Sequence, residues 1–267
     1  MKRMPSKTAS NRAHETSAER QSASVPRPVR YPDASALWRP ERIPAAERPA
    51  FLAILAAAVV IAAMLFGAYY ANVVSTNRET QASVDAALAR GATIDAPVLT
   101  SCVNMDGAAV KESLQNAGYT IVDVDQIKGT TSTGSFDLVK IPQDMTVDDA
   151  AAAYLAGVDS LDPATAAQFL SGSFRLEQTN APTTDLRLHY ADFQSTDADA
   201  AIDAAIAAQG FDASTASASA KDASGNTYRT GSANGMTWTV STCPLNEVYN
   251  VKGLPETAMY VGIRLTA

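Results

Sequence analysis

Residues 50–71 read AFLAILAAAVVIAAMLFGAYYA, and no side chain in this run is charged. At a rise of 1.5 Å per residue, a helix of this length extends about 33 Å and can cross the ~30 Å hydrocarbon core of a bilayer. A cleaved signal peptide has a shorter apolar part, and a helix at the surface of a globular domain keeps one polar face. The run therefore predicts a single uncleaved transmembrane helix of the signal-anchor type.

Charged residues are distributed unequally on the two sides of this helix. Residues 1–49 contain ten Lys or Arg and five Asp or Glu, whereas residues 72–267 contain eleven basic and twenty-three acidic residues. Because positively charged flanks stay in the cytoplasm, Arg48 is expected at the inner interface, and Tyr69 and Tyr70 at the outer one. The sequence thus predicts a single-pass protein of the cell membrane with a cytoplasmic N-terminus and an extracytoplasmic C-terminal domain. The lipid bilayer is its first expected partner.

The segments that adjoin the helix differ in composition. Residues 1–49 are rich in Ser, Thr, Arg and Pro and poor in apolar side chains, so we expect a disordered, basic cytoplasmic tail. Residues 72–94 keep a helical pattern as far as Gly91, which predicts a juxtamembrane helical stalk. The remaining residues, 95–267, are numerous enough to form one domain with a hydrophobic core.

Short apolar runs alternate with helical patterns in residues 95–267. Strands are expected at residues 97–103, 119–127, 135–141, 173–178, 185–191, 226–231, 236–243 and 258–265. Helices are expected at residues 107–117, 146–157, 163–170 and 197–209. Asp162 before Pro163 is typical of a helix start, and residues 222–226, DASGN, are typical of a hairpin turn. This mixture predicts an α+β fold.

One pattern occurs twice in the domain. The first copy comprises Ala109, Val110, Leu114, Gly118 and Tyr119, and the second, 92 residues later, comprises Ala201, Ile202, Ile206, Gly210 and Phe211. Each copy describes the apolar side of a helix, a glycine that ends the helix and an aromatic residue that opens a strand. The recurrence could record two similar halves, or it could be the general way in which a helix ends before a strand.

The chain contains two cysteines, Cys102 and Cys243, both in the part that is expected outside the cell. In an oxidising compartment, two thiols in one small domain favour a disulfide bond. Such a bond would join the first expected strand to one near the C-terminus. An intermolecular bridge and a reactive thiol are the alternatives. We expect the intramolecular disulfide.

One set of residues supports an enzymatic alternative. His189 is followed by residues 239–243, TVSTC, and then by Arg264. This order resembles that of sortase-type transpeptidases, which are also anchored at the N-terminus, and it implies attack on an acyl donor by the Cys243 thiolate beside His189 and Arg264. The chain departs from the family in the long interval between Cys243 and Arg264, in the residues around His189, and in its several expected helices.

Other ligand classes leave no clear pattern in the sequence. The acidic exterior argues against nucleic acid, because phosphate binding requires Lys and Arg. The acidic clusters lack the residue order of a calcium loop, and His189 is the one histidine outside the tail, which excludes a His-rich zinc site. We therefore expect no catalytic set, metal or cofactor. The leading hypothesis is a non-catalytic binding or scaffolding module of the cell envelope, for which an envelope protein or a glycan could be the partner.

Overall fold

The computed structural model of the chain describes residues 48–91, 95–181 and 185–267. The expected tail up to residue 47, and the side chain of Arg48, lie outside the described residues. The chain divides into two compact units, residues 1–64 and residues 65–267. In the described part, helices and strands are mixed, as the α+β prediction requires, and one helix is long and apolar.

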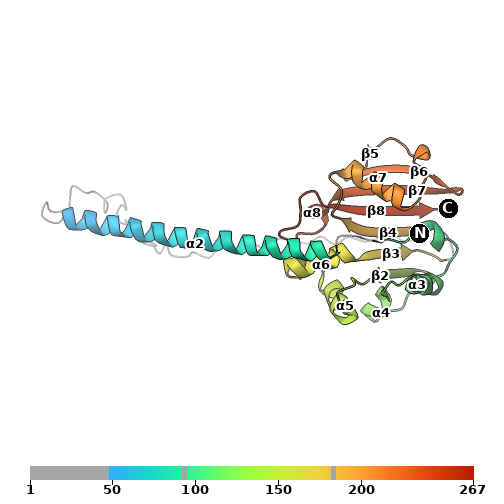
Figure 1. Ribbon diagram of the computed structural model, residues 1–267, viewed down its shortest axis with the longest axis horizontal. Helices are drawn as coiled ribbons and strands as arrows, with labels where there is room; N and C mark the ends of the chain where they lie inside the picture. The colour runs from blue at the N-terminus through green and yellow to red at the C-terminus, as the bar shows by residue number, and fades with distance from the viewer. Residues whose placement is uncertain (1–47, 92–94, 182–184) are drawn as a thin grey trace, which may run out of the picture. The chain divides into compact units, whose positions relative to one another are not determined.

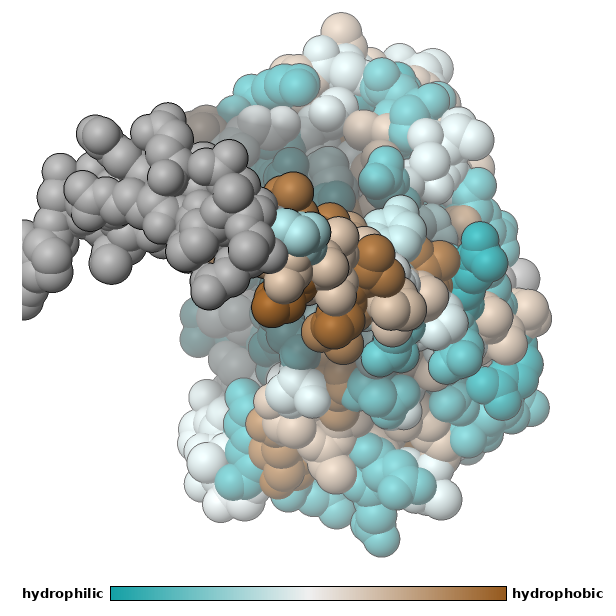
Figure 2. Space-filling model, turned by 90° about the vertical axis from the view of Figure 1, so that its left-hand side faces the viewer, coloured by the Kyte–Doolittle hydropathy of each residue, from teal (hydrophilic) through white to brown (hydrophobic). Residues whose placement is uncertain are grey.

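Helix α2 runs from Arg48 to Gly91 and contains the predicted membrane span. Its most apolar window has a mean hydropathy of 2.7, and none of that window is buried. The brown atoms near the centre of Figure 2 are hydrophobic side chains that face solvent. In the part of the chain that the structure describes, α2 is the one helix long and apolar enough to cross a bilayer. A helix that exposes apolar side chains all round is compatible with a membrane anchor.

Eight strands form one antiparallel sheet with the order β1-β2-β3-β4-β8-β7-β6-β5 (Figure 1). Their bounds are Ile121–Asp123 (β1), Phe136–Lys140 (β2), Phe174–Gln178 (β3), Asp185–Asp192 (β4), Ala220–Lys221 (β5), Thr227–Ala233 (β6), Met236–Pro244 (β7) and Met259–Thr266 (β8). The central pair is β4 and β8, in which Leu188 lies opposite Ile263. Because side chains alternate along a strand, the sheet has a first face, which carries Leu188 and Ile263, and a second face, which carries His189 and Gly262.

Two helices and a short 3-10 turn cover the first face of the sheet. They are α3 (Gly107–Asn116), α7 (Ala198–Ala208) and η2 (Leu99–Cys102). Leu188, Ile263 and Trp238 are almost wholly buried beneath them. This apolar contact is the main core of the domain, and burial of apolar area is its main source of stability, at about 25 cal/mol per Å².

Part of the second face is covered by α5 (Val147–Ala156) and α6 (Pro163–Gly172), which pack over β2 to β4. The remaining short helices are α4 (Val124–Lys128), η3 (Val158–Ser160), η4 (Ala213–Thr215) and α8 (Leu245–Val248). The last turns of α2 pack on α6, where Val84 and Ala87 contact Ala167. The loop after α8 also reaches α2, because Lys252 Nζ donates to Asn77 Oδ1 at 2.6 Å.

The long helices of the domain begin where the sequence indicates. Four side chains cap them by accepting a hydrogen bond from a backbone N–H three residues later: Asp106, Thr146, Asp162 and Asp197. A missing cap typically costs about 1 kcal/mol, so these residues fix the helix starts. All the expected helices are present, with ends within two residues of the expected ones.

The recurring sequence pattern corresponds to a recurring local structure. Helices α3 and α7 both end at a glycine with positive φ, and the aromatic residue that follows, Tyr119 or Phe211, donates its amide to the last turn of the helix at 3.1 Å. The Tyr119 ring then meets Phe174 of β3, and the Phe211 ring meets Trp238 of β7. Strands β3 and β7 flank the central pair on opposite sides. A common origin of the two halves stays a prediction.

The expected first strand, residues 97–103, is wrong. This segment forms η2, because the Gln209 side chain of the α7 C-terminus satisfies its backbone. Leu99 N donates to Gln209 Oε1 at 2.8 Å, and Gln209 Nε2 donates to Pro97 O at 2.9 Å. Because the side chain already satisfies these backbone N–H and C=O groups, they do not require hydrogen bonds to a neighbouring strand.

The expected strand at residues 119–127 is only partly present. Strand β1 ends at Asp123, whose carboxylate accepts a hydrogen bond from Asp125 N at 2.8 Å and starts α4. The apolar alternation of this segment favoured a longer strand, but a capping carboxylate favours the helix. The other expected strands agree with the structure to within two residues.

The expected disulfide between Cys102 and Cys243 is not present, and both cysteines are free. Cys102 belongs to the core on the first face of the sheet. Cys243 alternates along β7 with buried Thr242 and shares the second face with Tyr260, its neighbour on β8. The two thiols therefore lie on opposite sides of a continuous sheet, and strand alternation prevents them from meeting.

Candidate functional site

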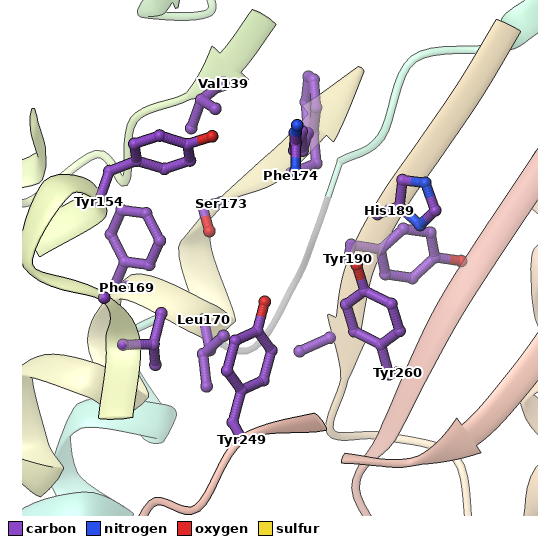
Figure 3. A pocket seen from close by; sticks show the side chains of 14 residues that line it. Val139, Tyr154, Phe169, Leu170, Ser173, Phe174, His189, Tyr190, Tyr249 and Tyr260 are labelled. Carbon is purple, nitrogen blue, oxygen red and sulfur yellow. The ribbon is translucent and has the colours of Figure 1, made fainter. Parts of the chain in front are cut away.

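A cavity of about 210 Å³ lies between the second face of the sheet and helices α5 and α6 (Figure 3). Aromatic side chains form most of its wall, and we call it the aromatic pocket. Its lining includes Tyr154, Phe169, Arg175, His189, Tyr249 and Tyr260. The volume is below the ~300–1,000 Å³ that is typical of drug-sized sites, so the pocket is suited to a ligand the size of one ring.

Strand alternation brings two of these residues to the pocket. Tyr260 lies between Met259 and Val261, which are buried on the first face, so its ring points to the second face. His189 follows the buried Leu188 on β4 and takes the same side. The other ring-bearing residues come from the helices and from the loop after α8. The pocket is thus built by several segments that lie between residues 139 and 260 of the sequence.

The rings of His189, Tyr260 and Tyr249 contact one another in sequence, one pair stacked and the other edge to face. Tyr260 stacks on His189 with ring centroids 5.8 Å apart and planes inclined by 16°. Tyr249 meets Tyr260 edge to face, with centroids 6.1 Å apart and planes inclined by 73°. Figure 3 shows these rings, with Tyr154 and Phe169 opposite, around one shared space. Edge-to-face and offset contacts of this kind hold aromatic side chains in fixed orientations.

The tyrosine hydroxyls supply the polar groups of the pocket. Burial raises the pKa of the Tyr154, Tyr249 and Tyr260 phenols, so all three are neutral at physiological pH. A neutral phenol both donates and accepts a hydrogen bond. The pocket therefore combines apolar ring faces with hydroxyl groups that can bind either donors or acceptors.

One guanidinium faces the pocket, and its charge is already compensated. Arg175 Nε and Nη2 donate to the two oxygens of Asp137 at 2.9 and 2.6 Å, and Nε also lies 2.9 Å from Glu177 Oε1. Hydrogen bonding to Asp137 raises the pKa of Arg175 further, so the group stays charged and paired. An anionic ligand would have to compete with two carboxylates for the guanidinium. The electrostatics therefore disfavour an anionic ligand.

His189 is mostly buried, and its Nδ1 has no hydrogen-bond partner among the residues that the structure describes. Burial lowers the pKa of His189; Glu177 opposes this effect, while Arg175 and Arg187 add to it. The imidazole is therefore neutral at physiological pH. A buried polar atom without a partner costs about 1–3 kcal/mol.

The pKa of His189 predicts how stability depends on pH. An unfolded histidine has a pKa of about 6.5, and the folded value is lower, so above pH 6.5 the imidazole is neutral in both states. As the pH falls below 6.5, the unfolded state binds the proton first. We expect the free energy of unfolding to fall in this range, by at most about 1.4 kcal/mol per pH unit, until the pH passes the folded-state pKa.

Urea denaturation of the full chain in detergent between pH 5 and 8 measures this effect. The His189→Gln variant should show a flatter dependence in the same range, because glutamine does not titrate. Paired carboxylates such as Asp185 titrate at lower pH, since hydrogen bonds from Arg264 lower the pKa of that group. An equal slope in the two proteins would contradict the assignment.

The structure brings two of the three residues of the enzymatic alternative together. His189 and Cys243 line the same cavity, on the side of Tyr260 that faces β7. Arg264 instead donates to the Asp185 carboxylate at 2.9 and 3.1 Å. Burial and the Glu247 carboxylate raise the pKa of the Cys243 thiol. A nucleophilic cysteine needs the opposite shift, so the surroundings of Cys243 disfavour its thiolate form.

The tyrosines of the pocket are functional candidates that the sequence did not reveal. Alternation in residues 258–265, AMYVGIRL, could have placed Tyr260, Gly262 and Arg264 on one face. Nothing local in the sequence connects this strand to Tyr154 or Tyr249. Their meeting depends on the pairing of β4 with β8 and on the position of α5, which are long-range features.

The described residues contain no group of three or more His, Cys, Asp or Glu side chains that could hold a metal ion. Comparison with known proteins finds no matching family model, no similar curated protein and no similar solved structure.

Proposed function

We propose that this chain is a membrane-anchored, non-catalytic binding module of the cell envelope, and that its aromatic pocket holds one ring of an uncharged glycan. The long apolar helix α2 supports the anchor. The change from a basic segment before the helix to an acidic segment after it supports a cytoplasmic N-terminus and an extracytoplasmic domain.

Proteolysis of intact cells tests the topology. A chain with one epitope tag at each end is expressed, and protease is added outside the cells. We expect the C-terminal tag to disappear and the N-terminal tag to remain in a membrane-protected fragment. Permeabilised cells, in which both tags should disappear, are the control. Loss of the N-terminal tag alone from intact cells would reverse the proposed orientation.

The observation that carries the ligand assignment is the combination of ring faces, neutral hydroxyls and a compensated guanidinium in one small cavity. A pyranose ring has an apolar face of C–H groups and an edge of hydroxyls, so it matches both kinds of surface at once. The acidic domain also disfavours an anionic polymer. An uncharged sugar therefore fits better than a phosphate or a carboxylate.

The apolar end of the pocket favours an N-acetylated sugar. Val158, Phe169 and Leu170 line this end and offer no charged group. An acetamido group carries a methyl that can be buried there and an amide that can bond to the tyrosine hydroxyls. A sugar with hydroxyls alone would leave the apolar end unfilled. Among uncharged sugars, we therefore expect the strongest binding from N-acetylglucosamine and similar rings.

Calorimetric titration of the full chain in detergent with N-acetylglucosamine tests this proposal. We expect saturable binding in the millimolar range, which corresponds to about −4 kcal/mol. Glucuronic acid, a ring of similar size with a negative charge, is the matched control and should not bind. The glycan assignment would be overturned if N-acetylglucosamine did not bind. It would also be overturned if an aromatic peptide bound more tightly and displaced the sugar.

A further inference from the structure

A second cavity, of about 360 Å³, adjoins the aromatic pocket on the second face of the sheet. Its lining comes from β7, β8 and the segments around them, and includes Asn226, Ser241, Cys243 and Glu247. His189 and Tyr260 line both cavities. The stacked pair of these two rings is therefore a shared wall between the two cavities. Helix α8 lines the second cavity, and Tyr249 directly after it lines the aromatic pocket.

The floor of the second cavity exists because residue 262 is glycine. A Cβ at this position would lie 3.1 Å from Ser241 Oγ and 3.4 Å from His189 Nδ1. The missing side chain leaves space between two polar atoms on neighbouring strands, and His189 Nδ1 has no partner within the described residues. Ser241 Oγ donates to Gly262 O at 3.3 Å and can still accept a hydrogen bond from a hydroxyl or amide of a ligand in this cavity.

The polar groups of the second cavity are of the kind that bind sugar hydroxyls. Ser224, Asn226 and Ser241 supply hydroxyl and amide groups. Glu247 supplies a carboxylate, which accepts hydrogen bonds from hydroxyls but repels anions. The lining is thus suited to an uncharged polyhydroxylated ring, and its chemistry continues that of the aromatic pocket.

We infer that the aromatic pocket and the second cavity are two subsites of one groove, which binds two neighbouring rings of a glycan chain across the His189–Tyr260 pair. This inference rests on the proposed function. A single sugar would occupy the aromatic pocket alone, whereas a dimer would also fill the space above Gly262. Affinity should then increase with chain length up to two rings and change little beyond that.

Cys243 allows the second subsite to be blocked without a mutation. Its thiol lines the second cavity and is partly exposed, whereas the other thiol, Cys102, is only 3% exposed in the core. N-Ethylmaleimide applied to the full chain in detergent should therefore modify Cys243 alone, which mass spectrometry of the intact protein verifies. The adduct fills the second subsite and leaves the aromatic pocket open.

The experiment compares N-acetylglucosamine with its β-1,4-linked dimer and tetramer before and after this modification. We expect the dimer to bind at least tenfold more tightly than the monomer, and the tetramer to equal the dimer. Modification should reduce the affinity for the dimer to that for the monomer, and it should leave the affinity for the monomer unchanged. In turn, the dimer but not the monomer should slow the reaction of Cys243 with the reagent.

The Gly262→Ala variant provides an independent block, because the added methyl group occupies the space between Ser241 and His189. This variant should bind the dimer no more tightly than the monomer, and its affinity for the monomer should equal that of the unaltered chain. Its circular dichroism should be unchanged. Equal affinities for monomer and dimer in the unmodified chain, or an equal loss for both after modification, would overturn the two-subsite inference alone. If neither sugar binds, the proposed function fails, and the inference fails with it.

Discussion

Replacement of Trp238 by alanine is expected to lower the free energy of unfolding by about 3–5 kcal/mol, the usual cost of removing a buried aromatic side chain. The indole is fully buried in the core on the first face of the sheet. It stacks on Phe211 with ring centroids 5.1 Å apart and planes inclined by 3°. Gly231 on the neighbouring strand leaves room for it, because a Cβ there would overlap the indole. The site is so closely packed that it cannot collapse around a smaller residue.

Urea denaturation of the full chain in detergent, followed by far-ultraviolet circular dichroism, measures this loss. Thr237→Ala, at the exposed neighbouring position, is the matched control and should change stability by less than about 0.5 kcal/mol. Trp238→Phe should cost less than Trp238→Ala, because a ring remains and a buried indole N–H without a partner among the described residues is removed. A loss below about 1 kcal/mol for Trp238→Ala would contradict the role assigned to this core.

Local sequence signals predicted most elements of the fold. Leu186 and Leu188 alternate with Arg187 and His189, which is typical of a strand, and β4 occupies the expected range to within one residue. Helix starts were equally predictable, since a capping side chain and the first turn are neighbours in the chain, as Asp162 shows. These features depend on residues a few positions apart, which a sequence displays directly.

Features that depend on distant contacts could not be predicted. The side chain of Gln209 converts residues 97–103 from the expected strand into η2, although more than a hundred residues separate the two segments. The disulfide prediction failed for a similar reason. Whether Cys102 and Cys243 share a face depends on which face of the sheet η2 packs against, which neither local pattern contains.

The candidate site was predicted least well. The sequence singled out His189 only through the enzymatic alternative, whereas its place in the pocket comes from Tyr260 beside it and Tyr249 beyond. These tyrosines follow no motif with fixed spacing. A binding site made of ring faces has weaker positional requirements than a catalytic set, so it leaves a weaker trace in the sequence.

Replacement of Tyr260 by alanine is expected to weaken binding of the N-acetylglucosamine tetramer by about 10- to 100-fold. The ring of Tyr260 contributes to both cavities, stacks on His189 and orients Tyr249. Its removal therefore eliminates a contact surface for the sugar and also frees two neighbouring rings to move. Loss of preorganisation adds to loss of contact, which is why this variant should have the largest effect on binding.

Two further variants separate the ring from the hydroxyl and from general effects on the sheet. Tyr260→Phe keeps the stacking contacts and should weaken binding by at most about tenfold, the value of one neutral hydrogen bond. Tyr228→Ala removes a tyrosine on β6 that pairs with Ser241 and is absent from the lining of both cavities, so binding should be unchanged. Titration of the full chain in detergent provides the three affinities. If Tyr260→Ala binds the tetramer as tightly as the unaltered chain, the glycan does not occupy this groove, because no ligand that fills either cavity can avoid the space that Tyr260 borders.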